Sequence, residues 1–352
     1  MASRLTFGVE FEFWFATLDL SSPDPNPDDK RPVTRLAQPL DRRSGPEIIA
    51  KALSDAGLPS RPEFLHEESE KTDTMWLVGV ESSLLLPNRL YDWYPVEVKT
   101  PPYYYCPESL EAVKYGLHIL TKNFRLHINE SCGLHVHIGN GLSGFDLKTL
   151  RTLMAFLWTF EPVLCQIHPN RPFVDSGYDD MYYPPLRRET ALAKTWRRPL
   201  PPNALDAENN LEDQPNRSAL TVRQGLSAIL QQDDIHSLTE LLNTRKKLAY
   251  NIKYLREPFE HQTKRTIEFR QHEGCLDGDR VIAWIQTAAG IVGFAQGCNL
   301  VAFTELVTTH ARLEDESEET YNVVDLLHDI GLDEPASFYC EVIYSELLGN
   351  IL

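Results

Sequence analysis

Residues 5–15 read LTFGVEFEFWF, and apolar side chains occupy every second position of this stretch. A β-strand has a two-residue period, so these side chains would share one face, while Glu10 and Glu12 would share the other. The stretch therefore predicts a strand that packs one face against a core and carries carboxylates on its opposite face. Shorter strands are predicted at 75–80, 95–100, 132–139 and 265–272.

Helical patterns separate these strands. A helix is predicted at 47–57, where the spacing is helical and a glycine ends the pattern. Longer helices are predicted at 107–128, which begins with proline, and at 147–167, which follows the capping residue Asp146. Further helices are expected at 221–231, 235–246, 279–296 and 323–348. The pattern indicates an α+β fold, in which a curved antiparallel β-sheet is backed by helices.

The length of 352 residues fits one catalytic domain over 1–352 that contains an insertion. We interpret residues 140–264, which combine predicted helices with a long loop, as that insertion. The loop at 169–220 is rich in Pro, Asp, Asn and Arg, and its length makes it a candidate substrate lid. Within it, Arg187 and Arg188 could clamp a phosphate or carboxylate, or could be solvated surface residues.

The charge balance limits the partners of the chain. It has 34 basic and 51 acidic residues, so its net charge of −17 disfavours nucleic acid and anionic membrane surfaces. A triphosphate would need divalent cations and local arginine or lysine to approach such a protein. Six scattered cysteines without a C-x-x-C pair are typical of reduced thiols, and no apolar run reaches the ~20 residues of a membrane span. The cytoplasm is the expected location, and the oligomeric state is left open.

Ionisable residues fall on one face of four predicted strands. If these strands share a sheet, that face gathers Glu10, Glu12, Glu97, Lys99, His135, His137, Glu268, Arg270 and His272. Alternate residues on a strand lie about 6–7 Å apart, too far for two carboxylates to hold one ion but suited to two neighbouring ions. The arrangement predicts a two-metal site, and the simpler alternative is a solvated sheet face.

The mixture of residue types indicates which metal would bind. Carboxylates outnumber imidazoles, which favours magnesium, or manganese, whereas the H-x-H pair alone would suit zinc. Arg270 on the same face could neutralise charge on a transferring phosphoryl group. Phosphoryl chemistry is therefore the predicted use of the site.

Four motifs in this order resemble the amidoligase family, of the glutamine synthetase and glutamate–cysteine ligase superfamily. They are FGVEFEFWF, VEVKTPP, CGLHVHIG and RTIEFRQHEG, which are spread over residues 7–275. The resemblance implies a glutamine synthetase-like catalytic fold and an ATP- and Mg²⁺-dependent carboxylate–amine ligase. Such an enzyme joins a small-molecule carboxylate to an amine through an acyl phosphate.

The resemblance also implies roles for individual residues. The metal ion that bridges the ATP phosphates would be held by Glu10, His135 and Glu268. The ion nearer the acceptor substrate would be held by Glu12, Glu97 and Glu81. Arg270 would contact the transferring phosphate or the substrate carboxylate, and His137 would lie close to the nucleotide or the substrate. Lys99 is the third catalytic candidate.

Two positions depart from the family pattern. In GVESSL, Glu81 stands where the family tends to have Asp ahead of a Ser-Leu pair, and Cys275 stands where many relatives have Thr. We interpret Cys275 as a packing residue. Two other functions stay open. One is a metal-dependent hydrolase that uses the His135 and His137 pair, and the other is an inactive relative that binds nucleotide.

Overall fold

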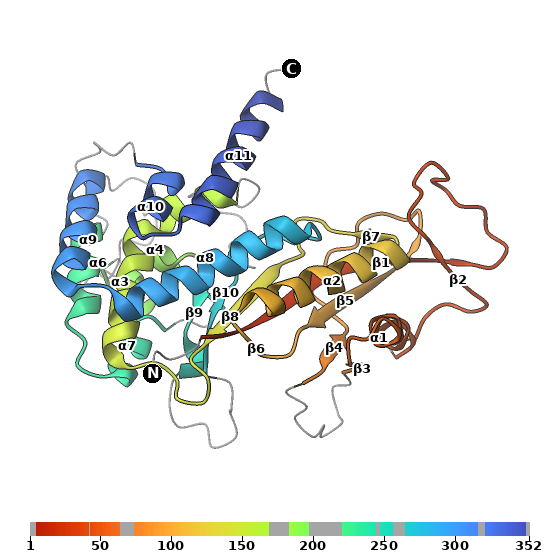
Figure 1. Cartoon of the computed structure of the whole chain (residues 1–352), viewed down its shortest axis with the longest axis horizontal. Coiled ribbons are helices and arrows are strands. Elements are labelled where there is room, and N and C mark those ends of the chain that lie inside the picture. The colour runs from red at the N-terminus through yellow and green to blue at the C-terminus, as the bar shows by residue number, and fades with distance from the viewer. Residues whose placement is uncertain are drawn as a thin grey trace, which may run out of the picture.

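The computed structural model describes residues 5–41, 43–63, 74–168, 183–196, 220–243, 247–255, 265–315 and 321–349. Within these ranges the protein is a mixed α/β structure with one large, mostly antiparallel open sheet of ten strands and with eleven α-helices (Figure 1). The strand order along the main path is β3-β4-β5-β1-β8-β10-β9, and β2, β6 and β7 pair with β1. Two pairs, β1 with β2 and β3 with β4, are parallel.

The central strand is β1 (Thr6–Asp19), which spans 14 residues and pairs with five others. The other strands are β2 (Thr34–Leu36), β3 (Ser60–Pro62), β4 (Trp76–Gly79), β5 (Asp92–Lys99), β6 (Tyr103–Tyr104), β7 (Leu126–His127), β8 (Leu134–Gly139), β9 (Tyr250–Asn251) and β10 (Thr266–Phe269). The motif-bearing stretches of the sequence are thus neighbours in one sheet.

Helices α2 (Pro107–Asn123) and α8 (Gly278–Gly297) lie along one face of this sheet (Figure 1). The other helices are α1 (Ser44–Asp55), α3 (Leu147–Leu164), α4 (Leu186–Glu189), α5 (Ala191–Trp196), α6 (Val222–Leu230), α7 (Ile235–Leu241), α9 (Leu300–Asp315), α10 (Val323–Asp329) and α11 (Asp333–Gly349), with 3₁₀ turns η1 (Cys165–Ile167) and η2 (Lys253–Leu255). The main core is continuous between Phe11 of β1, Leu117 of α2, Phe156 of α3 and Trp284 of α8.

The predicted cap of α3 is confirmed, because the Asp146 side chain accepts a hydrogen bond from the Thr149 backbone. The sequence overextended one of the long helices and missed another. The helix expected at 107–128 ends at Asn123, because the chain turns into β7 to pair with β1. Helix α9 was not predicted. Its buried residues Phe303 and Val307 are four positions apart, a spacing that could have revealed it.

The alternation of β1 holds only over its first half. From Phe11 to Leu18 every residue is buried, so this half of the strand is covered on both faces. Trp14 packs with Leu84 and Cys132, and Leu18 packs in a cluster with Tyr91. The segment 80–91 therefore lies over the far half of the carboxylate face and bounds the site described below.

Among the described residues, no helix combines the length and the apolar character needed to cross a membrane. The proposed lid at 169–220 lies mainly outside the described residues, so it stays a prediction, as does the insertion at 140–264. The described part of the lid contains Arg187 in α4.

Candidate metal centre

The register of the sheet decides which ionisable side chains meet. Glu10 of β1 lies opposite His135 of β8 on one side and Lys99 of β5 on the other. Two residues further along β1, Glu12 lies opposite Glu97. Residues opposite each other on paired strands project from the same face. The sheet thus places Glu10, Glu12, Glu97 and His135 on one face, away from α2 and α8.

Three side chains form a first ligand group: Glu10, His137 and Glu268. One ligand atom from each lies within 4.8 Å of the others. The Nε2 atom of His137 is 3.0 Å from Glu10 Oε1 and 3.8 Å from Glu268 Oε1. Each of the three comes from a different strand, so the backbone of the sheet fixes their relative positions.

Neighbouring side chains orient this first group. Asn251 of β9 donates from Nδ2 to Glu268 Oε2 at 2.8 Å, and Arg270 donates to the other oxygen of Glu268. Thr266 Oγ1 lies 3.2 Å from His137 Nδ1. Burial acts to raise the pKa of Glu268, but the nearby His137 and Arg270 outweigh it and lower that pKa. Glu268 is therefore a carboxylate at neutral pH.

The second ligand group consists of Glu12, Glu81 and Glu97, with one oxygen of each within 4.8 Å of the others. The Gly133 backbone donates to Glu12 Oε2 at 2.7 Å. A Cβ at position 133 would lie 2.5 Å from His135 Nε2 and 3.2 Å from Glu12 Oε2, so a larger residue would force the His135 ring to shift. Glu81 lies on the segment 80–91, which is not part of a strand at this position.

The second group carries strong mutual repulsion. Burial, together with the charges of Glu81 and Glu97, raises the pKa of Glu12 to about 8. The pKa of Glu97 is also raised, chiefly by burial and then by Glu10. Lys99 Nζ offsets part of this charge, because it lies 2.9 Å from Glu97 Oε2 and 2.8 Å from Glu63 Oε2. The group would gain from a further positive charge.

His135 lies between the two ligand groups. Its Nδ1 atom is 3.3 Å from Glu10 Oε2 and 3.7 Å from Glu12 Oε1, and Arg270 lies 3.4 Å from the same nitrogen. Burial lowers the pKa of His135, so the ring is neutral at neutral pH and can act as a ligand. The structure thus groups His137 with Glu10 and Glu268, whereas the family resemblance gave that place to His135. That assignment stays a prediction.

The sheet does not bring His272 to this face. Glu268 pairs with His137, but Glu273 bridges to Gly133, so five steps along one strand match four along the other. This β-bulge reverses the alternation of side chains after Arg270. The His272 ring packs toward α8, with its centroid 5.6 Å from that of Trp284. The prediction that His272 belongs to the carboxylate face was therefore wrong.

Arg187, a possible phosphate or carboxylate clamp in the sequence, forms contacts within the protein. Pro162 lies inside α3 and has no N–H, so the Trp158 carbonyl cannot accept the usual helical hydrogen bond. Arg187 Nε donates to that carbonyl at 2.6 Å, and its terminal nitrogens bind the Thr159 carbonyl and Glu314. The guanidinium is thus bound by groups of α3 and α9.

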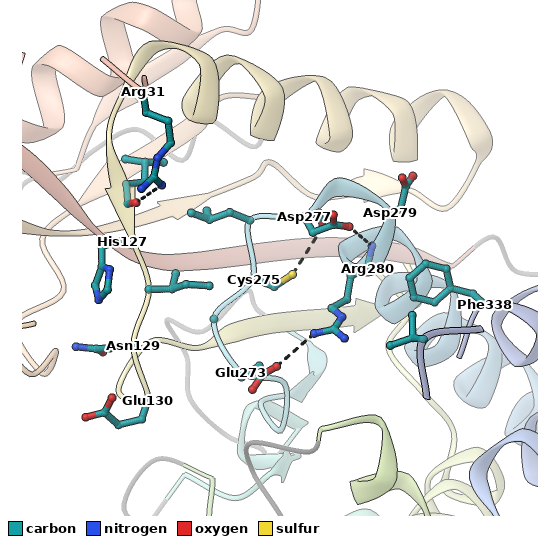
Figure 2. Close-up of a pocket in the computed structure, with 15 residues that line it drawn as sticks. Arg31, His127, Asn129, Glu130, Glu273, Cys275, Asp277, Asp279, Arg280 and Phe338 are labelled. Atoms are coloured by element: carbon teal, nitrogen blue, oxygen red, sulfur yellow. Dashed lines mark hydrogen bonds and ion pairs between the residues drawn. The ribbon is translucent and has the colours of Figure 1, made fainter. Parts of the chain in front are cut away.

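A cavity of about 1170 Å³ lies between the segments 126–130 and 273–280. Figure 2 shows Glu273 and Arg280 turned toward each other within it, with 3.5 Å between their charged atoms. Cys275 also lines the cavity but is buried, and burial raises its pKa to about 11. A thiol with so high a pKa is unreactive at neutral pH, which agrees with a packing role.

Residues 3–178 match the family described as "putative amidoligase enzyme". The match spans half of the chain, and the chain belongs to this family, as the sequence motifs predicted. The matched range contains β1, β5 and β8, whereas β10 lies beyond it. No curated protein matches the chain. Membership of the family indicates an enzyme of the ligase type.

Proposed function

We propose that this protein is an ATP- and Mg²⁺-dependent carboxylate–amine ligase with a glutamine synthetase-like catalytic fold. The observation that carries the proposal is the pair of adjacent ligand groups on one sheet face of an amidoligase family member. Mn²⁺ is the alternative ion. The substrates would be a small-molecule carboxylate and an amine.

The residues present fit divalent cations. The two ligand groups offer five carboxylates and one imidazole, a donor set that suits Mg²⁺ or Mn²⁺ better than Zn²⁺. Ligands on opposite sides of Mg²⁺ are about 4.2 Å apart, so donor atoms within 4.8 Å of one another need only small shifts. Burial and then the charges of Glu81 and Glu97 raise the pKa of Glu12, and a bound cation would favour its ionised form. Bound Mg²⁺ would neutralise phosphate oxygens as phosphoryl transfer proceeds.

In this proposal Glu10, His137 and Glu268 would hold the ion at the ATP phosphates, with His135 as a further donor. Glu12, Glu81 and Glu97 would hold the ion near the acceptor carboxylate. Arg270 touches both Glu268 and His135, and its guanidinium would bind the transferring phosphoryl group. His137 would also lie close to the nucleotide. Lys99 would hold Glu97 in place and attract the substrate carboxylate.

The reaction would proceed in two steps. A carboxylate oxygen of the acid would attack the γ-phosphorus of ATP, which releases ADP and forms an acyl phosphate. The amine would then attack the carbonyl carbon, lose a proton and displace phosphate to give the amide. The chain's own contribution is to align the phosphoryl group with Arg270 and to hold the acceptor carboxylate beside Glu12 and Glu97.

A screen for ADP release tests the proposal. Pairs of carboxylates and amines would be incubated with ATP and Mg²⁺, and amide products identified by mass spectrometry. We expect ADP and amide to form in equal amounts with at least one pair. Nucleotide binding without ADP release across the whole panel would indicate an inactive relative instead. Tightly held zinc together with ATP-independent hydrolysis would indicate the hydrolase.

A further inference from the structure

The position of Glu81 depends on how the segment 80–91 docks onto the sheet. Glu12 and Glu97 lie on paired strands, whereas Glu81 lies on this segment, outside the strands. The Ser83 backbone donates to Glu81 Oε1 at 2.9 Å, so the carboxylate is oriented relative to its own segment. Leu84 is buried against Trp14 and Cys132. The fit of the segment to the sheet therefore decides where the Glu81 carboxylate lies.

Leu85 of this segment is held by hydrogen bonds to its backbone. The Leu85 N–H donates to Ser131 Oγ at 2.9 Å, and the Leu85 carbonyl accepts from Asn129 Nδ2 at 2.7 Å. The Ser131 hydroxyl donates to Asn129 Oδ1 at 2.6 Å, which couples the two side chains. The Leu85 side chain is 51% exposed, so backbone contacts and not side-chain packing hold this residue. We call Asn129 and Ser131 the backbone clamp.

The turn that carries the backbone clamp also holds Glu12. Ser131 is 1% exposed, and two residues further on Gly133 donates to the Glu12 carboxylate. The turn is closed by a hydrogen bond from Cys132 N to the Asn129 carbonyl, and Gly274 N donates to the Cys132 carbonyl at 2.7 Å. The turn at 129–133 thus contacts the second ligand group twice, once through Glu12 and once through the segment that brings Glu81.

We propose that Asn129 and Ser131 are positioning residues, which fix Glu81 in the second ligand group by clamping Leu85. The inference rests on the proposed function, since it takes Glu12, Glu81 and Glu97 to be metal ligands. Residues that orient a ligand from outside the coordination shell change metal affinity by about 10–100-fold when they are removed. Loss of the backbone clamp should therefore weaken the binding of one ion and leave the binding of the other unchanged.

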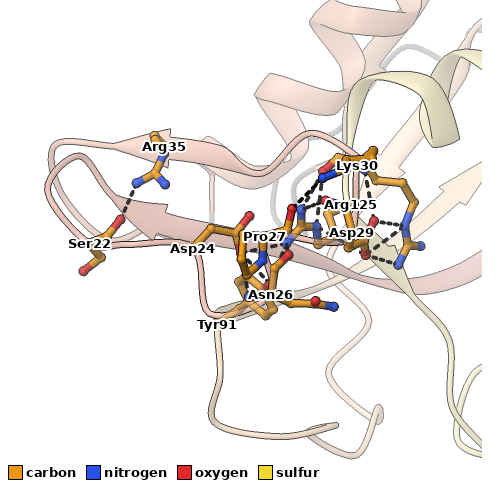
Figure 3. Close-up of polar contacts among 10 residues, drawn as sticks. Ser22, Asp24, Asn26, Pro27, Asp29, Lys30, Arg35, Tyr91 and Arg125 are labelled. Carbon is orange, nitrogen blue, oxygen red and sulfur yellow. Dashed lines mark hydrogen bonds and ion pairs between the residues drawn. The ribbon is translucent and has the colours of Figure 1, made fainter.

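The far end of the same segment offers a matched control. Tyr91 donates to Asp24 Oδ1 at 2.8 Å, beside the buried Arg125 (Figure 3). Arg125 binds Asp24 at 2.9 Å and the Arg31 carbonyl at 2.8 Å, which secures the loop that faces Tyr91. Tyr91→Phe removes a hydroxyl from the docked segment, as Ser131→Ala removes one from its clamp, but it acts ten positions from Glu81.

The experiment is a Mn²⁺ titration followed by electron paramagnetic resonance. It would compare the full chain with the variants Ser131→Ala, Asn129→Ala, Glu81→Gln, Ser131→Ala/Glu81→Gln and Tyr91→Phe, after circular dichroism has confirmed folding. We expect two ions to bind to the parent. Ser131→Ala and Asn129→Ala should each lower the affinity for one of the two ions by about 10–100-fold. Tyr91→Phe should bind both ions like the parent, and Ser131→Ala should have no further effect once Glu81 is replaced.

The outcomes separate this inference from the proposed function. If the parent binds no Mn²⁺, the proposed function fails, and the inference fails with it. If the parent binds two ions and the clamp variants match it, or if Ser131→Ala still weakens binding in the Glu81→Gln background, only the inference is overturned. Should Ser131→Ala not fold, Asn129→Ala decides by the same criteria.

Discussion

Asn251 donates a hydrogen bond of 2.8 Å to Glu268 across the pair formed by β9 and β10. Asn251 is buried, and no sequence motif pointed to it. The contact fixes one oxygen of Glu268, while Arg270 binds the other. The Glu268 carboxylate of the first ligand group is therefore oriented before any substrate binds.

Replacement of Asn251 by Ala should weaken metal binding at the first ligand group. The released oxygen of Glu268 could then rotate, and loss of such an orienting partner costs about 10–100-fold in affinity. Calorimetric titration with Mn²⁺ would measure this. Thr239→Ala, which removes a buried hydroxyl bonded within α7, is the control. Equal affinities for Asn251→Ala and the parent would exclude this role.

Glu268 and Arg270 should separate into two roles on mutation. Glu268→Gln keeps the shape of the side chain but removes a charged ligand, so the Mg²⁺ concentration needed for ATP binding should rise. Arg270→Lys keeps the charge but loses the planar fork of donors. Turnover should fall by about 10²–10³-fold, as when a preorganised transition-state donor is removed, with metal binding preserved. Parent-like rates of ADP release in both variants would refute the assignment on this strand.

The raised pKa of Glu12 predicts the pH dependence of stability without metal. Its value of about 8 exceeds the ordinary 4.5, so between these pH values the folded state holds a proton that the unfolded state has lost. The free energy of unfolding should therefore fall as pH rises from about 5 to 8. Thermal melts in chelator across this range would show it, and Glu12→Gln should flatten the trend. If the stability of the parent and that of Glu12→Gln change with pH in the same way, the prediction is contradicted.

Arg125 should be important for stability. Its guanidinium is buried and binds two carboxylates and several backbone carbonyls of the loop at 24–31 (Figure 3). Arg125→Met removes the charged hydrogen bonds to these acceptors, at a cost of about 2–3 kcal/mol in the free energy of unfolding. Arg35 is exposed and binds carbonyls of the same region, so Arg35→Met is the matched control. Urea unfolding would compare them, and equal losses would contradict the interpretation.

The sequence predicted the carboxylate face well because strand alternation is a local property. Glu10 and Glu12 could be placed from β1 alone, and the partner strands carry the same signal. The misplaced residue, His272, follows a one-residue bulge that only the pairing with Gly133 reveals. Trp14 shows the same limit, since its burial on the carboxylate face depends on a segment that docks from elsewhere in the chain.

Other site residues carried no local signal. Asn251 lies in a strand of two residues, too short for any periodicity to appear. Glu81 was named through a motif, but its approach to Glu12 follows from the clamp at Asn129 and Ser131, which depends on side-chain contacts between distant segments. Such contacts are set by tertiary structure and cannot be read from composition or spacing.

A calorimetric titration of ATP with and without Mg²⁺ tests the central claim most directly. The carboxylates of the two ligand groups should repel a free triphosphate, whereas divalent cations would join the two. We predict binding in the presence of Mg²⁺ and no detectable binding in chelator, with Glu10→Gln shifting the required Mg²⁺ concentration upward. Tight binding of ATP that is the same with Mg²⁺ and with chelator would contradict a metal-bridged nucleotide site on this face of the sheet.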